Sequence, residues 1–154
     1  MLKVKPFKQK TGFCGPASLK MVLDYFGVKK SEGNLAKLTG CTITKGVEAK
    51  NLLKVAKKSG FNGSIKDFSE IEDIKKYVQK KKIPVIVDWF SKDEGHYSVV
   101  VGIEKKNIYL HDPELGRMRK IDIETFKRVW FDFPGRFLRS KNEIIIRRII
   151  AIYK

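Results

Sequence analysis

The stretch KQKTGFCGPASLKMVLDYFG, residues 8–27, decides the fold because it places a cysteine at the start of an amphipathic helix. Pro16 fits the first helical turn, where its missing N–H has no intrahelical partner. Apolar residues then recur on one helical face, at Leu19, Val22, Leu23 and Phe26. Gly27 is typical of the residue that follows a helix end. We therefore predict a helix that begins at Cys14 and ends before Gly27.

Further helices are expected in the first half of the chain. A short helix is expected over residues 31–38. Thr44 matches the N-cap of a longer helix over residues 45–59, which Gly60 would end. Ser69 and Glu72 have the spacing of a capping box, which opens a helix that ends near residue 81.

After Pro84 the pattern changes from helical to strand-like. Three expected strands are the short β-branched runs PVIVDWF (84–90), YSVVVGIE (97–104) and NIYLHDP (107–113). RMRKID (117–122) is expected as a fourth strand and EIIIRRIIAIY (143–153) as a closing one. Asp122 is expected to cap a short helix through Trp130, and residues 62–64 to form a turn. Helices followed by an antiparallel sheet predict an α+β fold, as a single domain over residues 1–154.

The charge of the chain is strongly positive, with 33 Lys and Arg against 17 Asp and Glu and a net charge of +16. Such a charge is compatible with an acidic partner or an anionic surface. The lysine clusters fall at several expected helix ends, however, and no aromatic residues alternate with them to stack bases. We expect no dedicated nucleic-acid site and leave an anionic partner open.

The expected cellular setting is the cytoplasm. No apolar run approaches the ~20 residues that a transmembrane helix needs. The first ten residues lack the apolar core of a signal peptide. Two cysteines do not make a disulfide framework, which favours a reducing compartment.

Cys14 at a helix N-terminus predicts a reactive thiol. Unpaired backbone N–H groups and the positive end of the helix dipole favour its thiolate, which is the nucleophilic form. A neighbouring base would complete the activation, and the chain offers two histidines, His96 and His111.

The geometry of a hairpin selects His96 as the base. His96 begins one expected strand and Asp112 ends the next, so the two side chains can lie side by side. His111 is adjacent to Asp112 in one strand, so its side chain is expected on the opposite face. We predict a triad in which Cys14 is the nucleophile, His96 the base and Asp112 the group that orients His96.

These residues also carry a resemblance to a known family. The runs QKTGFCGPASLKMVLDYFG, GHYSVVVGI and IYLHDP resemble the double-glycine leader peptidases and their stand-alone relatives, a family of papain-like cysteine peptidases. TKGVEAKNLLKVAKKSGF and KIPVIVDWF extend the resemblance over most of the chain, and CGPASLKMVL is closer to stand-alone members. The resemblance implies a papain-like fold, a helical N-terminal half packed on an antiparallel C-terminal sheet, and the same three roles for Cys14, His96 and Asp112.

The resemblance also implies a glutamine that donates a hydrogen bond to the developing oxyanion. Gln9 is the candidate, together with the backbone N–H of Cys14. Gln9 lies five residues before Cys14, where the family pattern usually leaves six. Lys8, at the sixth position, is an alternative donor.

Other residues receive structural or secondary roles. Trp89 and Phe90 precede the loop to His96 and are candidates to line a substrate groove, or equally core aromatics at a strand end. Cys41 and His111 are expected to be structural. We expect no cofactor and no metal site, since the chain has two histidines and two widely spaced cysteines.

The expected function is that of a thiol hydrolase, most specifically a cysteine peptidase that acts on peptide or protein substrates through an acyl-enzyme. Cleavage after Gly-Gly in leader-type peptides is the first specificity to consider. Two alternatives stay open on the same residues: an inactive relative that binds peptides, and an amidase or acyltransferase. A basic nucleic-acid binder would instead lose affinity steeply with salt and be indifferent to Cys14.

Overall fold

The computed structural model describes residues 1–154 and contains five α-helices and eight strands. The helices are α1 (Cys14–Tyr25), α2 (Glu32–Thr39), α3 (Ala49–Lys58), α4 (Ile71–Lys75) and α5 (Ile123–Val129). The strands are β1 (Asn62–Lys66), β2 (Val85–Ser91), β3 (Glu94–Glu104), β4 (Asn107–Asp112), β5 (Arg117–Asp122), β6 (Phe131–Asp132), β7 (Ile145–Ile146) and β8 (Arg148–Tyr153). A π-helical segment, Lys76–Lys80, continues α4, and a 3-10 turn covers Lys141–Glu143.

Six strands form one sheet in the order β1-β8-β2-β3-β4-β5, and every neighbouring pair is antiparallel. β6 and β7 pair separately. The expected antiparallel sheet is thus confirmed, but not as a product of the second half alone. Residues 62–64, expected as a turn, belong to β1 at the edge of the sheet, where they pair with the C-terminal strand β8.

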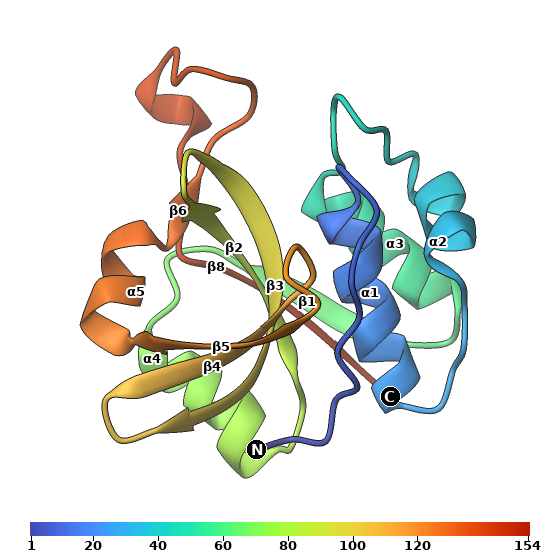
Figure 1. The fold of residues 1–154 in the computed structure, drawn as a ribbon, viewed down its shortest axis with the longest axis horizontal. Coiled ribbons are helices and arrows are strands. Elements are labelled where there is room, and N and C mark those ends of the chain that lie inside the picture. Colours follow the sequence, from blue (N-terminus) through green and yellow to red (C-terminus); the bar gives the residue numbers. More distant parts are fainter.

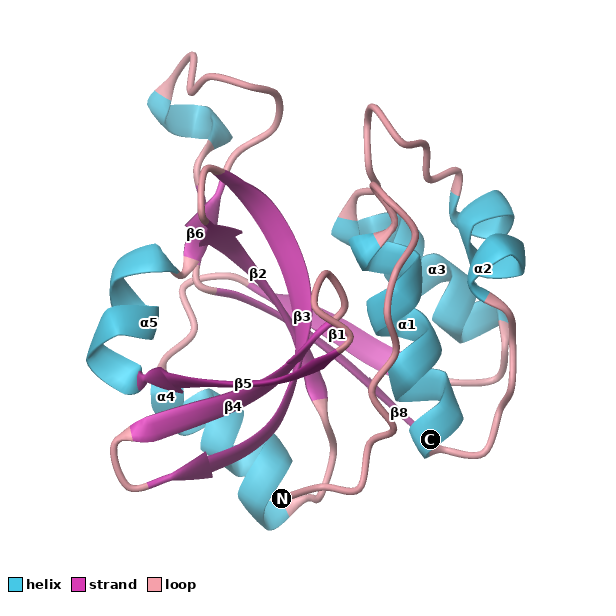
Figure 2. Ribbon diagram, viewed as in Figure 1, coloured by secondary structure: helices cyan, strands magenta, loops and turns pink.

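Helices lie on two sides of this sheet (Figures 1 and 2). α1, α2 and α3 gather on one side, and α4 and α5 on the other. A cluster of 17 buried residues fills the space between the first group and the sheet, and a cluster of 13 fills the other side. None of the helices has the length and apolarity that crossing a membrane would require.

Backbone hydrogen bonds tie the segment before α1 to the sheet and to the residue that follows β4. The backbone N–H of Leu2 donates to the carbonyl of Val101 at 2.8 Å, and the N–H of Gln9 donates to the carbonyl of Pro113 at 2.8 Å. Figure 1 shows this segment running alongside α1. The start of α1 is therefore fixed next to the end of β4.

Two helix starts differ from the expectation. α3 begins at Ala49 and not at residue 45, because the backbone groups of Thr42 and Gly46 pair with each other and the Thr42 hydroxyl accepts from the N–H of Lys45. The intervening residues are thus held in a closed turn. Thr44 accordingly does not cap α3.

The capping box at α4 lies one residue later than expected. Glu70 is the N-cap residue of this helix, and the Asp73 carboxylate accepts from the N–H of Glu70 at 2.8 Å. The Ser69 hydroxyl donates to the carbonyl of Lys66 instead. The sequence therefore allows a helix start at Ser69 or at Glu70, and the structure has the one at Glu70.

The expected C-terminal strand is interrupted at Arg147. This residue has a φ of +48°, and its backbone N–H donates to the carbonyl of Trp130. β7 before the break pairs with β6, whereas β8 after it enters the main sheet between β1 and β2. The stretch expected as one strand therefore contributes strands to two sheets.

Candidate active site

Cys14 is the first residue of α1 and is half-buried. Phe13 precedes it as the N-cap, and no side chain caps this helix end. The first-turn N–H groups therefore stay open beside the thiol, where they favour negative charge. The expected helix and its start at Cys14 are confirmed.

His96 and Asp112 meet as the hairpin geometry predicted. Nε2 of His96, on β3, lies 2.6 Å from Oδ1 of Asp112, at the end of β4. Both side chains are buried, with exposed fractions of 4% and 1%. The remaining ring nitrogen, Nδ1, is left for the hydrogen bond between His96 and Cys14.

The surroundings of His96 favour its charged form. Burial opposes the charge, but hydrogen bonds with Asp112 and Cys14 and the negative charges of both groups outweigh burial and raise the pKa of His96 to about 10. Burial likewise opposes the charge on Asp112. The hydrogen bond and charge of His96, followed by Arg119 and the N–H of Glu114, nevertheless lower the pKa of Asp112 to about 2. A histidine held between a thiol and a carboxylate can take the proton of the thiol and then, as the imidazolium, protonate a leaving group.

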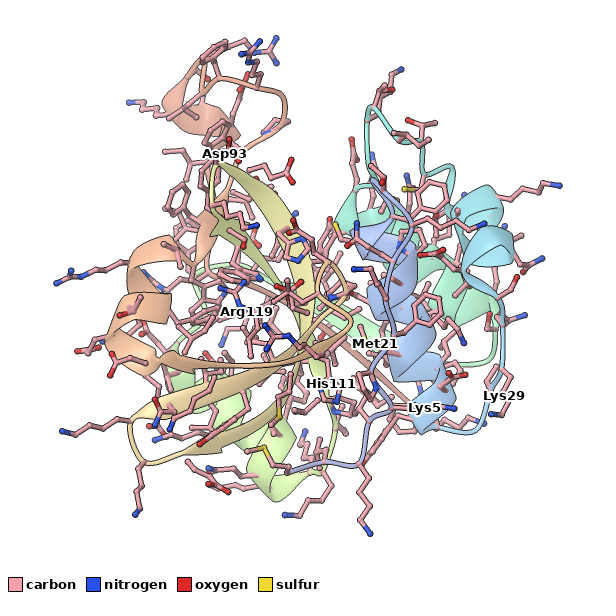
Figure 3. The ribbon with its side chains drawn as sticks, in the orientation of Figure 1. Lys5, Met21, Lys29, Asp93, His111 and Arg119 are labelled. Carbon is pink, nitrogen blue, oxygen red and sulfur yellow. The ribbon has the colours of Figure 1, made fainter.

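His111 and Cys41 point elsewhere. Nε2 of His111 lies 2.6 Å from the carbonyl oxygen of Val4, so this ring packs against the N-terminal segment (Figure 3). Burial lowers the pKa of His111, which keeps the ring neutral. Cys41 is buried, and burial, followed by the charges of Cys14 and Glu32, raises the pKa of its thiol to about 11. Both residues have the surroundings of structural groups.

Gln9 lies next to the end of β4, since its backbone N–H is bonded to Pro113. Its side-chain Nε2 donates one hydrogen to the carbonyl of Lys10 at 3.2 Å, which leaves the second N–H free. Its Oε1 is buried without a hydrogen-bond partner. The structure thus holds the backbone of Gln9 near Asp112 and leaves its amide incompletely bonded.

The two groove candidates differ in exposure. Trp89 is 3% exposed. Its Nε1 donates to the Ser98 hydroxyl at 3.0 Å, and its ring packs edge-on against the ring of His96, with 6.0 Å between the ring centres. Its role as a groove-lining residue is therefore wrong, because almost none of its surface can meet a substrate. Phe90 is half-buried and stacks on Phe131 and Phe133, at ring distances of 5.2 and 5.4 Å.

Comparisons with known proteins add to this geometry. The family model described as the Peptidase C39 family matches residues 6–133. The chain belongs to the peptidase C39 family. An uncharacterized protein of Methanothermobacter marburgensis is 34% identical over 137 residues, which are 88% of this chain and 87% of that protein. The transport/processing ATP-binding protein ComA of Streptococcus pneumoniae is 33% identical over 124 residues, which are 76% of this chain but 16% of that protein.

Solved structures of C39 peptidases share the fold. A double glycine motif protease from an AMS/PCAT transporter, in complex with its leader peptide, has a TM-score of 0.75 and 26% identity, with 99% of this chain and 92% of that chain covered. The peptidase domain of Streptococcus ComA also has a TM-score of 0.75, at 22% identity, with 97% and 98% covered. The papain-like α+β fold expected from the resemblance is confirmed.

Two further residues near the C39 site escaped the sequence-based prediction. Arg119, on β5, donates from Nη1 to Oδ2 of Asp112 at 2.9 Å. Asp88, on β2, is 1% exposed and lies opposite Tyr97 in the sheet. Arg119 had no local signal, because it is one of several cations in an alternating strand. Asp88 did have one, as the single charge in the apolar run IPVIVDWF.

Asp88 faces a second carboxyl group, that of Asp132. Burial, followed by the hydrogen bond and the charge of Asp132, raises the pKa of Asp88 well above its ordinary value. Arg148 lies opposite Asp88 in β8, but its guanidinium is engaged by Asp67 at 2.6 and 2.9 Å. Burial and the neighbouring carboxyl group of Asp132 thus favour the protonated form of Asp88.

One group of potential metal ligands exists at this site. The ligand atoms of His96, Asp112 and Glu114 lie within 4.8 Å of one another. Nε2 of His96 and Oδ1 of Asp112 already bond to each other, however, and the Glu114 carboxylate is 3.7 Å from Nζ of Lys92. The contacts describe a hydrogen-bonded pair and a surface ion pair.

Proposed function

We propose that this C39 family member is an active cysteine peptidase that uses Cys14, His96 and Asp112. The observation that carries the proposal is the position of His96, whose ring is bonded to Asp112 at Nε2 and interacts with Cys14 on its other side. Membership of a peptidase family supports the reaction class.

The proposed reaction starts with the thiolate of Cys14 and the imidazolium of His96. The sulfur attacks the carbonyl carbon of the peptide bond, and the carbonyl oxygen takes up the negative charge. Nδ1–H of His96 then gives its proton to the leaving amine as the C–N bond breaks, which leaves a thioester on Cys14. Neutral His96 next takes a proton from water, and the resulting hydroxide releases the acid and regenerates Cys14.

Two N–H donors are proposed to stabilise the oxyanion. One is the backbone N–H of Cys14 and the other is Nε2 of Gln9. The hydrogen bond from the backbone N–H of Gln9 to Pro113 supports this role, because it holds the Gln9 backbone next to the residue that follows Asp112. The free N–H of its amide supplies the donor.

The proposed substrate is a peptide with a Gly-Gly pair, cleaved after the second glycine, in the cytoplasm. The solved protease of similar fold is described as a double glycine motif protease and was captured with a leader peptide. Both thiols of this chain are free, which fits a reducing compartment.

The pH dependence of alkylation tests the reactive pair without knowledge of the substrate. Cys14 in the wild type is expected to react rapidly with iodoacetamide well below pH ~8.5, the ordinary pKa of a thiol, and to lose this reactivity in His96→Ala. Mass mapping separates Cys14 from buried Cys41, which serves as the internal control. A Cys14 that reacts no faster than Cys41 would contradict the proposal and favour a peptide-binding role.

A further inference from the structure

Arg119 makes three contacts that converge on the proposed triad. Its Nη1 donates to Oδ2 of Asp112 at 2.9 Å and approaches the hydroxyl of Ser91 at 3.4 Å. Its guanidinium carbon lies 5.2 Å from the centre of the Trp89 ring. Figure 3 labels Arg119 in the middle of the molecule, over the sheet. The side chain is therefore held by a carboxylate, a hydroxyl and an aromatic face together.

The two oxygens of Asp112 have separate partners. Oδ1 meets Nε2 of His96 at 2.6 Å and accepts from the backbone N–H of Glu114 at 2.9 Å. Oδ2 has Arg119 as its hydrogen-bond partner. Since Asp112 is 1% exposed, loss of Arg119 would leave one oxygen of a buried carboxylate unbonded, which is costly.

Trp89 links the two ends of this arrangement. Its ring lies under the guanidinium of Arg119 and also meets the ring of His96 edge-on. Its own Nε1 is fixed by the Ser98 hydroxyl. The buried ring of Trp89 therefore contacts both side chains that are hydrogen-bonded to Asp112, namely Arg119 and His96.

We propose, on the basis of the function proposed above, that Arg119 is a positioning residue that fixes Asp112 and thereby orients His96 toward Cys14. It touches neither the nucleophile nor the substrate. Its guanidinium balances the carboxylate charge, holds Oδ1 in line with Nε2 of His96, and maintains Asp112 as an ionised acceptor.

The pH profile of Cys14 alkylation depends on the charged groups that face His96 and Asp112. His96 faces Cys14 from α1 and Asp112 from β4. Asp112 faces His96 from β3 and Arg119 from β5. The Glu114–Lys92 ion pair lies at the edge of the same site. Arg119 is thus the one cation other than His96 that bonds directly to Asp112.

Substitutions at one position and a matched control test the proposal. Arg119→Met removes the charge at similar length, and Arg119→Lys keeps a charge but loses the planar stack on Trp89. Arg117→Met is the control, because Arg117 lies on the same strand, is exposed and forms no ion pair. Full-length variants are compared by the pH–rate profile of Cys14 alkylation and by an NMR titration of the histidine rings. The chain has only two histidines, and burial shifts the pKa of His111 in the opposite direction to that of His96.

In Arg119→Met we expect the His96 titration to shift, because Asp112 is no longer held in line with Nε2 of His96. We expect the alkylation rate of Cys14 near pH 6 to fall by about tenfold, since a hydrogen bond to a charged group is worth on this order. Arg119→Lys should recover part of both changes, and Arg117→Met should show neither. If Arg119→Met does not fold, the proposal is tested by whether the His96 titration shifts in Arg119→Lys. An unchanged His96 titration in a folded Arg119 variant would overturn the proposal. Failure of the proposed function would look different, because wild-type Cys14 would itself react like an ordinary thiol.

Discussion

Cys14 and Cys41 carry the same thiol in opposite surroundings. Cys14 lies half-buried at an open helix start beside His96, whereas Cys41 is buried and burial raises its pKa to about 11. The contrast follows from position, since Cys14 lies beside a histidine whereas Cys41 is buried and the nearby charge of Glu32 disfavours its thiolate. At the scale of single residues, the surroundings of a thiol therefore decide whether its thiolate is favoured.

Gln9→Ala is expected to separate oxyanion stabilisation from thiol activation. Peptide cleavage should fall by about 10²–10³-fold in kcat/KM, the usual cost of losing one oxyanion donor. Alkylation of Cys14 by iodoacetamide should stay near the wild-type rate, because that reaction forms no oxyanion. Steady-state cleavage and alkylation rates measured on one preparation check both points.

Lys8→Ala is the matched variant for Gln9→Ala, because Lys8 occupies the sixth position before Cys14. We expect it to keep wild-type cleavage. Loss of cleavage in Lys8→Ala with normal cleavage in Gln9→Ala would reassign the donor.

Asp88→Asn is expected to stabilise the folded protein at neutral pH. Burial and Asp132 raise the pKa of Asp88, so the folded state keeps a proton that the unfolded chain releases above pH ~3.9. The free energy of unfolding of the wild type should therefore fall with pH above this value, by up to about 1.4 kcal/mol per pH unit for this group. Asparagine does not titrate and can still donate to Asp132.

Urea unfolding from pH 4 to 7 checks the Asp88 prediction. The stability advantage of Asp88→Asn should be small at pH 4 and grow toward pH 7. Asp67→Asn, which weakens the fork on Arg148, should destabilise the protein. An advantage that does not change with pH would contradict a protonated Asp88.

At the scale of elements, strong periodicity made the main helices and strands predictable, and local ambiguity limited the rest. α1, β2 and β4 carry clear apolar patterns, and their ends lie within one residue of the expected ones, whereas β3 begins at Glu94, three residues earlier than expected. β1 was missed because the polar sequence NGSIK acquires its strand conformation only by pairing with β8, far along the chain. The break at Arg147 likewise depends on contacts with Trp130 and Ser69 that no local pattern reveals.

The site was predictable to the extent that it follows from pairing. A turn of known length between β3 and β4 places His96 and Asp112 together. Arg119 and Asp88 required knowledge of which strand faces which, and Trp89 required knowledge of which face of β2 is covered. Side-chain roles that depend on tertiary neighbours cannot be read from spacing alone.

Gly15→Ala tests how closely α1 is packed beside the nucleophile. A Cβ at this position would lie 2.3 Å from Cγ1 of Val47, so we expect a loss of about 1–3 kcal/mol in the free energy of unfolding and slower alkylation of Cys14. The double substitution Gly15→Ala with Val47→Ala should recover part of the loss. Chemical denaturation of the two variants provides the measurement.

Gly33→Ala is the control for Gly15→Ala, because nothing lies within 4 Å of a Cβ there, in α2. It should raise the free energy of unfolding by about 0.5–1 kcal/mol through helix propensity. Equal effects at Gly15 and Gly33 would mean that the contact with Val47 is not restrictive.

At the scale of the whole molecule, the proposed triad spans the junction between the helical layer and the sheet. Cys14 comes from α1, whereas His96 and Asp112 come from β3 and β4. Two hydrogen bonds join the layers near the site, from the Tyr97 hydroxyl to the carbonyl of Val47 at 2.9 Å and from the N–H of Gln9 to Pro113 at 2.8 Å. The proposed activity therefore requires that both layers keep their relative position.

The stability of the whole molecule should report the charge on His96. Its pKa of about 10 lies above the ~6.5 of an unfolded histidine, so its contribution is full below pH ~6.5 and is lost as pH rises through 10. Relative to His96→Asn, the wild type should lose up to about 1.4 kcal/mol of unfolding free energy per pH unit between pH 6.5 and 9. Denaturant unfolding across this range measures the difference.

The comparison with His96→Asn also removes the contributions of two other buried groups. Burial also raises the pKa values of Cys41 and Tyr97, so each group lowers stability once it ionises in the unfolded chain, from about pH 8.5 for the thiol and about pH 10 for the phenol. Wild type and His96→Asn share this effect, so it cancels in their difference. Parallel pH dependences of wild type and His96→Asn within the range would argue against a charged His96 in the folded protein.

Peptide cleavage followed by mass spectrometry tests the central claim most directly. Wild type and Cys14→Ala are incubated with peptides that contain Gly-Gly and with matched peptides in which either glycine is replaced by leucine, and the products and any acyl adduct are mapped. Cleavage after Gly-Gly with a transient thioester on Cys14, both absent in Cys14→Ala, is the predicted result. Cleavage that persists in Cys14→Ala, or no cleavage of any peptide by a wild-type protein whose Cys14 is rapidly alkylated, would contradict the account.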